Sequence, residues 1–398
     1  MKIAVFHNLP SGGAKRALHG YLDYLTKMEH IVDVFVPSTA NEEFLPLKEV
    51  SNSIEIFPVE KTTKGAIIST FKYVSPLIKT ISLRDLEITE KKIAETINSK
   101  DYDIVFSEQD QYTMTPFFLK YIQHPTVYYC PQPPRNEAIL EKVSDENKKY
   151  NPLKRFIFNQ ADNKDLKIDK NNISYAQNIL TNSYFTRESI LRVYGLNSYV
   201  SYLGIDTDLF RPLEVPEEDF VLSVGSCRPS KGYDFIIRSL ALIESEIRPK
   251  LVIVSNFSLP DWKSHLEKLA SQLDVDLQIL DMIDDEKLIN LYNKAKLVLY
   301  APYMEPFGLV PLEAMGCGTP VVGVKEGGIR ETVIHNHTGL HSERDEHLFA
   351  DATSKLLKKD LKRYNMSKNS IKAVQDYWTL EQSGKRLLWH LNRILDKI

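Results

Sequence analysis

Residues Glu305 to Gly323 have the sequence EPFGLVPLEAMGCGTPVVG and follow an apolar run that ends at Tyr300. The apolar run is typical of a buried strand, and Gly308 marks the place where a helix is expected to begin. The first N–H groups of a helix have no partner within it, and that helix end carries partial positive charge. The sequence therefore predicts an anion site, suited to a diphosphate, at the carboxyl edge of a sheet.

Two glutamates flank this expected helix start. Glu313 falls in the early turns of the helix, where its carboxylate can accept hydrogen bonds from paired hydroxyls such as those of a ribose. Glu305 falls in the loop, free to contact a sugar hydroxyl. For two glutamates alone, an exposed loop residue and a helix-start carboxylate would be the simpler interpretation. The surrounding glycines favour a ligand site.

The alternation of strand-like and helix-like segments continues along the whole chain. In the second half, short apolar runs occur at 220–224, 251–254, 277–280, 297–300 and 320–324. In the first half, such runs occur at 3–6, 31–36, 54–59, 104–106 and 127–129. Each half therefore predicts a Rossmann-like α/β domain, a parallel sheet covered by helices.

The Pro-rich acidic stretch at 211–219 has no apolar periodicity and indicates a nearby domain boundary. We expect an N-terminal domain over 1–205 and a C-terminal domain over 206–378. Residues 379–398 place apolar side chains at helical spacing, which predicts a terminal amphipathic helix. Either domain could receive this helix, including the N-terminal one.

Composition excludes several classes of protein. The chain has 398 residues, 43% hydrophobic and 26% charged, which suits a globular protein with more than one core. The formal net charge of −3 leaves no basic excess to hold nucleic acid. The 3 cysteines show no pairable spacing, and the N-terminus lacks the features of a secretory signal, so a cytoplasmic protein is expected.

Several motifs together resemble glycosyltransferase family 4, whose members carry two glutamates separated by seven residues. The matching segments are Glu305 to Val322, Glu326-Gly-Gly-Ile-Arg-Glu331, Asn336-His-Thr-Gly-Leu340, Thr181-Asn-Ser183, Tyr202-Leu-Gly-Ile-Asp206 and Gly12-Gly-Ala14. The resemblance spans almost the whole chain. It implies the GT-B fold, two Rossmann-like domains facing each other across a central cleft, with the acceptor bound by the domain over 1–205 and the donor by the domain over 206–378. It also implies sugar transfer with retention of anomeric configuration.

The resemblance also implies roles for donor-site residues. Glu305 would bind the sugar of a nucleotide-diphosphate donor and Glu313 its ribose. The backbone of Phe307, Gly308 and Leu309 would lie close to the phosphates. No metal or other cofactor would be required, because fixed cations and N–H donors can neutralise the diphosphate.

The loop GSCRPSKG at 225–232 is the expected source of those cations. Lys231 falls where the family places its phosphate-binding lysine. The family's partner arginine usually follows the first glycine, Gly225, whereas this chain has Ser226 there and Arg228 two places later. For an isolated loop, solvated surface charges would be the preferred interpretation. The family pattern favours a catalytic Lys231 and leaves both interpretations open for Arg228.

Candidates for the donor and acceptor sides also occur in the N-terminal half. Gly12 and Gly13 follow the first strand and either allow close approach of a ligand or form a plain tight turn. Lys15 and Arg16 stand where relatives often carry glutamate, which favours an anionic acceptor. The family's loop histidine is replaced by Pro131. Its contacts would come from elsewhere, with the acceptor-side candidates Glu108, Gln109, Asp110, Gln132 and Arg135.

The expected acceptor is a glycan or a lipid-linked molecule, in cell-surface polysaccharide or glycolipid synthesis. Residues 64–83 and 148–158 mix basic and apolar side chains, so either could contact the inner face of a membrane or simply cover the sheet. The acidic pairs at 101/103 and 206/208 look like a metal motif. Short acidic pairs are common among 53 acidic residues, and no metal site is expected.

Other functions can use a similar fold. A nicotinamide-dependent dehydrogenase should carry G-x-G-x-x-G after the first strand, where this chain has Pro10-Ser-Gly-Gly13. A nucleotide-sugar epimerase, a sugar phosphorylase and a non-catalytic nucleotide-sugar-binding subunit are the alternatives to a transferase.

Overall fold

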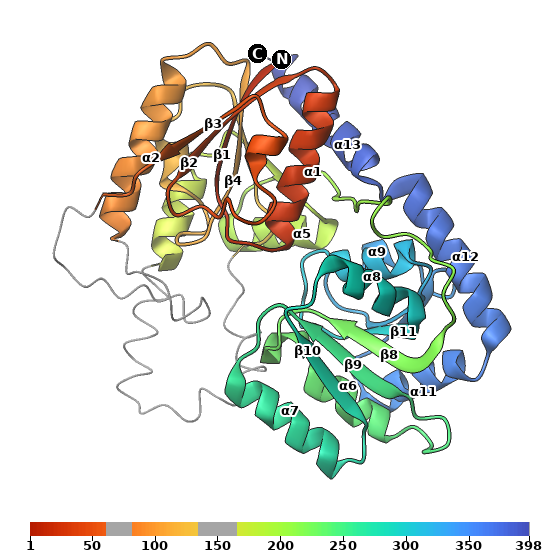
Figure 1. The fold of residues 1–398 in the computed structure, drawn as a ribbon. Coiled ribbons are helices and arrows are strands. Elements are labelled where there is room, and N and C mark those ends of the chain that lie inside the picture. The colour runs from red at the N-terminus through yellow and green to blue at the C-terminus, as the bar shows by residue number, and fades with distance from the viewer. Residues whose placement is uncertain (61–81, 134–164, 398) are drawn as a thin grey trace, which may run out of the picture. The chain divides into compact units, whose positions relative to one another are not determined.

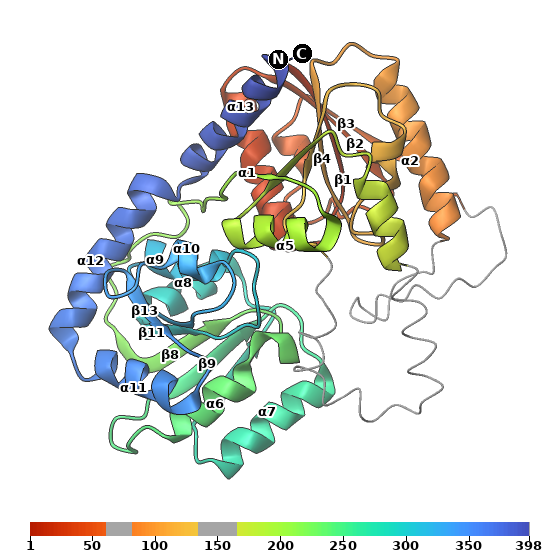
Figure 2. The same cartoon turned by 180° about the vertical axis from the view of Figure 1, so that it is seen from behind.

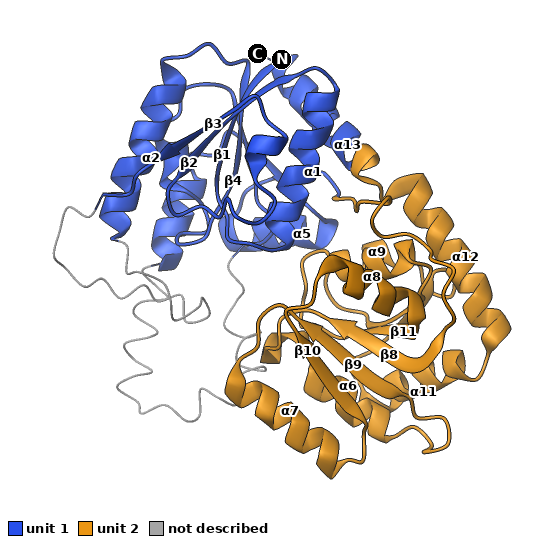
Figure 3. Cartoon of the chain, in the orientation of Figure 1, with its two compact units in different colours: residues 1–135, 146–202, 383–398 blue, residues 136–145, 203–382 orange. Residues whose placement is uncertain are grey.

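The structure is a computed structural model that describes residues 1–60, 82–133 and 165–397. The chain divides into two compact units (Figure 3). Of the described residues, unit 1 contains 1–60, 82–133, 165–202 and 383–397, and unit 2 contains 203–382. The chain thus leaves unit 1 near residue 203 and returns to it near residue 383, where the sequence predicts changes at 205 and 379.

Unit 1 is built on a parallel sheet with the strand order β3-β2-β1-β4-β5-β6-β7 (Figure 1). The strands are β1 (Lys2–Asn8), β2 (Ile31–Pro37), β3 (Ser53–Phe57), β4 (Ile104–Asp110), β5 (Thr126–Tyr129), β6 (Asn178–Thr181) and β7 (Tyr199–Val200). The helical segments are α1 (Gly13–Lys27), η1 (Leu47–Glu49), α2 (Leu83–Asn98), η2 (Phe117–Lys120), α5 (Tyr184–Tyr194) and most of α13 (Leu380–Leu395).

Helices cover both faces of this sheet, which explains why its central strands β1, β2 and β4 are buried along most of their length. On one face, Phe6 and Val105 pack with Ile93 of α2. On the other, Tyr21 of α1 lies edge-on to Phe106, with ring centroids 6.2 Å apart. The terminal helix α13 belongs to unit 1 as well.

Unit 2 has a parallel sheet with the order β10-β9-β8-β11-β12-β13 (Figure 2). The strands are β8 (Glu218–Val224), β9 (Lys250–Ser255), β10 (Leu277–Asp281), β11 (Ala295–Tyr300), β12 (Val321–Val324) and β13 (Gly339–Ser342). The helical segments are η4 (Pro229–Lys231), α6 (Tyr233–Ala241), α7 (Pro260–Gln272), α8 (Asp285–Lys294), α9 (Leu309–Gly316), α10 (Ile329–Thr332), α11 (Glu346–Leu357) and α12 (Asp360–Tyr377).

The expected fold class, two α/β domains with parallel sheets, is confirmed by these sheets. The apolar patterns did not indicate β6, β7 or β13. Their sequences, NILT, YV and GLHS, contain at most two consecutive apolar residues, too few to give an apolar run that stands out from the surrounding sequence.

Candidate active site

The segment between β11 and α9 has the geometry that the sequence predicts. The strand ends at Tyr300, and α9 begins at Leu309 with Gly308 as its N-cap. Gly308 has φ 96°, a left-handed conformation that favours glycine. As a glycine, this N-cap has no side chain to bond the helix end. Its first N–H groups and positive end are therefore suited to an anion.

Glu305, in this segment, is paired with Lys231 from another loop. The Lys231 Nζ donates to Glu305 Oε2 at 3.0 Å, and the two side chains are 24% and 21% exposed. Lys231 comes from η4, directly after β8, and its side chain passes beside Gly225. The Tyr233 hydroxyl donates to the Gly225 carbonyl at 2.8 Å and so fixes the loop beneath the lysine. Two predicted residues from different loops thus form one charged pair that solvent can reach.

The Gly327-Gly328 pair packs directly against the backbone of the Glu305 segment. The Gly328 N–H donates to the Glu305 carbonyl at 2.8 Å. A Cβ atom at Gly327 would lie 2.2 Å from the Glu305 carbonyl oxygen, and one at Gly328 would lie 2.3 Å from that of Pro306. Only glycine permits this approach. The two loops therefore support each other and fix the direction of the Glu305 side chain.

Glu313 lies in α9 and accepts a hydrogen bond from the Tyr292 hydroxyl at 2.8 Å. Tyr292 is fully buried on α8, and burial followed by the nearby Glu313 charge raises its pKa well above the ordinary value. The hydroxyl therefore keeps its proton and remains a donor. The sequence analysis missed Tyr292, because only the packing of α8 against α9 brings it to Glu313.

The other predicted donor-site residues have varied surroundings. Phe307 is 3% exposed, with its ring centroid 5.8 Å from that of Trp378. Ser226 and Leu309 are half-buried. The Arg228 guanidinium lies over the Phe257 ring at 4.3 Å. Its role as partner of Lys231 stays a prediction.

In unit 1, Gly12 is the N-cap of α1 with φ 136°, and Gly13 is exposed at the first position of the helix. A Cβ atom at Gly12 would have open space around it, so the backbone is accessible to a ligand. Arg16 lies over the Phe44 ring at 5.5 Å and is half-buried. These positions are compatible with the expected roles.

Lys15 does not add to the surface charge expected beside Arg16. Its side chain is fully buried, and its ammonium pairs with Glu42 and lies 3.3 Å from His7 Nε2. Burial lowers the pKa of His7 to about 4, so this histidine is neutral at pH 7. Burial would raise the pKa of Glu42, but hydrogen bonds from His7, Lys15 and the Leu47 N–H lower it to about 2. Lys15 therefore holds the loop that carries Glu42 against β1.

The acceptor-side candidates at the end of β4 are buried. Gln109 donates through Nε2 to the Gln132 carbonyl at 2.8 Å, which joins β4 to the loop after β5. Asp110 accepts from Asn8 Nδ2 at 2.5 Å. Burial raises the pKa of Glu108 to about 8 and also raises that of Asp110. These contacts show how the loops are held, and acceptor binding by these residues stays a prediction.

The remaining predictions concern residues outside the described ranges, metal binding and membrane contact. Arg135 and the segments 64–81 and 148–158 lie outside them. Within the described ranges, no group of three or more His, Cys, Asp or Glu side chains is placed to hold a metal ion. Asp206 caps its own turn by accepting from the Asp208 N–H at 2.9 Å. In the same ranges, no helix combines the length and apolar character needed to cross a bilayer.

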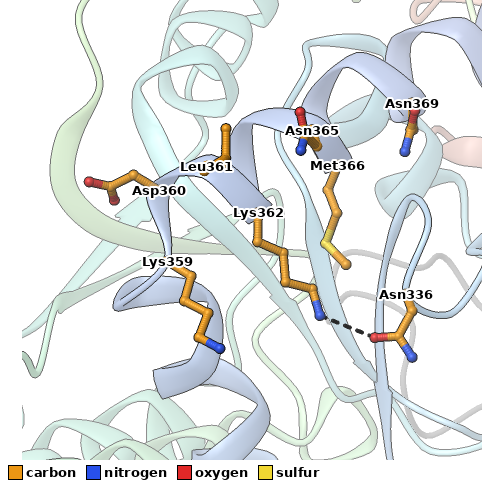
Figure 4. A pocket seen from close by; sticks show the side chains of 8 residues that line it. All are labelled: Asn336, Lys359, Asp360, Leu361, Lys362, Asn365, Met366 and Asn369. Carbon is orange, nitrogen blue, oxygen red and sulfur yellow. Dashed lines mark hydrogen bonds between the residues drawn. The ribbon is translucent and has the colours of Figure 1, made fainter.

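A pocket of about 580 Å³ occurs in unit 2 away from these residues (Figure 4). It is lined by Asn336 and by the first turns of α12, and Lys362 donates to Asn336 Oδ1 at 3.2 Å across it. The lining contains none of the predicted site residues.

Known proteins resemble this chain over the segment that carries these residues. Residues 205–373, which include the Lys231, Glu305 and Glu313 positions, match the family model for Glycosyl transferases group 1. D-inositol 3-phosphate glycosyltransferase 2 of Catenulispora acidiphila is 30% identical over 209 residues, covering 46% of this chain and 49% of that relative. The chain thus spans about half the length of this curated relative. These matches support a transferase enzyme, as the sequence predicts.

Two solved structures are similar over nearly the whole chain. Sucrose-phosphate synthase from Thermosynechococcus elongatus has a TM-score of 0.74 and 19% identity, covering 100% of both chains. Anabaena Alr3699/HepE in complex with UDP has a TM-score of 0.72 and 18% identity, covering 99% of this chain and 100% of its own. Similarity at these identities shows the fold, and the GT-B prediction is confirmed.

Proposed function

We propose that the chain is a retaining glycosyltransferase that moves a sugar from a nucleotide-diphosphate donor to a glycan or lipid-linked acceptor. The observation that carries the proposal is the Lys231–Glu305 pair, 3.0 Å between charged atoms, which joins η4 to the loop that leads to the N-terminus of α9. A cation, a helix end and a carboxylate in one place provide partners for both the phosphates and the hydroxyls of a sugar diphosphate.

The proposed chemistry depends on where charge develops. As the bond between the anomeric carbon and the phosphate oxygen breaks, negative charge grows on the diphosphate and the sugar becomes oxocarbenium-like. Lys231 and the N–H groups of α9 would stabilise that charge, a task that bound divalent cations perform in many phosphate sites. Glu305 would accept a hydrogen bond from a sugar hydroxyl. Glu313, which Tyr292 holds in place, would accept hydrogen bonds from the ribose hydroxyls. No metal takes part in this proposal.

The relatives suggest the classes of substrate. HepE was solved with UDP, which supports a donor in which the sugar is linked to a nucleoside diphosphate. The Catenulispora relative is named for D-inositol 3-phosphate, which supports an anionic acceptor. On this chain Arg16 is the candidate for such an acceptor, because Lys15 is paired with Glu42.

The proposal is tested by the reaction products. Uridine, guanosine and adenosine diphosphate sugars are first screened by thermal shift, since a ligand that binds the folded state raises its melting temperature. The bound donor is then incubated with phosphorylated and lipid-linked acceptors, and released nucleoside diphosphate and product anomer are measured by NMR. Release that requires acceptor, with retained configuration, is expected. Binding without turnover would indicate a non-catalytic subunit, and conversion of the donor sugar without acceptor would indicate an epimerase.

A further inference from the structure

Arg344, between β13 and α11, makes four directed hydrogen bonds in unit 2. Its guanidinium binds both oxygens of Glu326, with Nε to Oε1 at 2.8 Å and Nη2 to Oε2 at 2.7 Å. It also donates to the carbonyls of Ala301 and Pro302, each at 3.0 Å. Glu326 and the two carbonyls belong to segments far apart in the sequence.

Aromatic rings fix the plane of the same guanidinium. The Arg344 Cζ lies 3.8 Å from the centroid of the Tyr303 ring and 5.4 Å from that of Phe235. The arginine side chain is 16% exposed. A planar fork that stacks and binds bidentately at once is a geometry that lysine cannot reproduce.

Both segments held by Arg344 lead to Glu305. The Ala301–Pro302 carbonyls begin the loop that carries Glu305, and Tyr303 N–H in that loop donates to the Ser230 carbonyl at 2.9 Å, next to Lys231. Glu326 precedes the two glycines that pack on Glu305, where the Gly328 N–H donates to the Glu305 carbonyl at 2.8 Å. Arg344 therefore joins the two loops that determine where the Glu305 carboxylate lies relative to Lys231.

We propose that Arg344 is a positioning residue for sugar transfer, which holds Glu305 and the start of α9 in place through Ala301, Pro302 and Glu326. The inference rests on the proposed function, but its structural part can be tested without any reaction. The residue itself need not contact the donor. Its role depends on four directed hydrogen bonds rather than on charge alone.

Arg363 provides a matched control in the same unit. It binds both oxygens of Glu217, at 3.2 and 2.7 Å, and the Leu356 carbonyl at 2.9 Å, and its side chain is 9% exposed. It is thus an arginine with the same kind of partners that contacts none of the site loops described above. Arg344→Lys and Arg363→Lys should lose similar stability, whereas their effects on the site should differ.

The test compares these variants by hydrogen exchange and by turnover. In Arg344→Lys, exchange at the Tyr303 and Gly328 amides should rise about tenfold through local opening, with no change in Arg363→Lys. The kcat of Arg344→Lys should fall by about tenfold to a hundredfold with little change in donor KM, because the reacting groups are misplaced. Added guanidinium should restore part of the kcat of Arg344→Ala. Equal exchange and equal kcat in the two lysine variants would overturn the proposal, whereas an inactive wild type with the expected exchange difference would overturn only the proposed function.

Discussion

At the scale of single residues, the Glu305 carboxylate is the group on which the proposed chemistry depends. Glu305→Gln keeps the shape of the side chain but removes its charge and the ion pair with Lys231. We expect kcat to fall by about 10² to 10³, as when one stabilising group is removed from a preorganised site. Steady-state kinetics with the identified donor measures this effect. Glu267→Gln, an exposed glutamate on α7, is the control, and equal kcat in the two variants would remove Glu305 from the mechanism.

Tyr292 has a narrower predicted effect, on donor binding. Tyr292→Phe removes the 2.8 Å hydrogen bond to Glu313, and a bond to a charged group contributes about 1.5 to 3 kcal/mol. The donor KM should therefore rise by about tenfold or more, with a smaller change in kcat. Tyr121→Phe is a matched control, since the Tyr121 hydroxyl donates to Glu87 at 2.7 Å in unit 1. A donor KM raised equally in both variants would mean that Tyr292 acts only on stability.

The raised pKa of Glu108 should make the stability of the chain depend on pH. Burial raises its pKa to about 8 in the folded chain, from an ordinary value of 4.5. The folded state therefore holds a proton that the unfolded state loses, so the free energy of unfolding falls as pH rises between about 4.5 and about 8. In Glu108→Gln, the free energy of unfolding should decrease less with rising pH, so the variant should be more stable than the wild type near pH 8. Urea unfolding from pH 5 to 8.5 measures it, with the exposed Glu43→Gln as control. A parallel pH profile for wild type and Glu108→Gln would contradict the prediction.

The residues of the donor site differ in how far the sequence could predict them. Lys231, Glu305 and Glu313 stand within motifs, and their loops follow strands that apolar runs reveal, so their neighbourhood could be predicted. Tyr292 and Arg344 could not, because their roles arise from tertiary contacts with residues outside those motifs. The prediction for Lys15 was wrong, because the sequence made a buried side chain look exposed. A basic pair at a helix start looks exposed until the loop carrying Glu42 covers one member.

At the scale of elements, close packing of α13 against α1 depends on one glycine. A Cβ atom at Gly384 would lie 2.1 Å from Tyr24 Cγ, far inside van der Waals contact. Gly384→Ala gains about 1 kcal/mol of helix propensity. Overpacking at such a contact costs about 1 to 3 kcal/mol, and the severity of the overlap places this site at the high end. We expect a lower urea midpoint for Gly384→Ala and no change in the midpoint for Lys385→Ala, a neighbouring exposed position. A stabilised Gly384→Ala would show that α13 is packed more loosely.

Elements with long apolar runs could be predicted, whereas short or polar elements could not. The runs at 31–36 and 220–224 correspond to β2 and β8 almost residue for residue. β7 has only 2 residues, and its position depends on pairing with β6 rather than on its own pattern. The terminal helix was predicted from its apolar spacing. Its attachment to unit 1, through contacts such as His390 Nε2 with the Val200 carbonyl at 3.1 Å, lies beyond what periodicity can show.

At the scale of the whole molecule, the described chain passes from unit 1 to unit 2 near residue 203 and returns near residue 383, and the segments at these two places pair with each other. The Ile205 N–H donates to the Trp378 carbonyl at 2.8 Å, and the Leu380 N–H donates to the Ile205 carbonyl at 3.0 Å. Unit 1 consequently contains both ends of the chain. The alternating pattern predicted two α/β domains, but nothing in the sequence pattern brings residue 205 beside residue 379.

The central claim is that Lys231, which pairs with Glu305 of the loop before α9, binds the diphosphate of the donor. Calorimetric titration of nucleoside diphosphates into the whole chain tests it most directly, with Lys231→Met compared against Lys296→Met. Lys296 is a good control because it pairs with Asp219 at 2.7 Å near the opposite end of β11 from the Glu305 loop. We predict that one nucleoside diphosphate binds the wild type and Lys296→Met equally, and binds Lys231→Met about tenfold or more weakly, as expected for a lost charge-assisted contact. Equal affinity in all three proteins would contradict the claim.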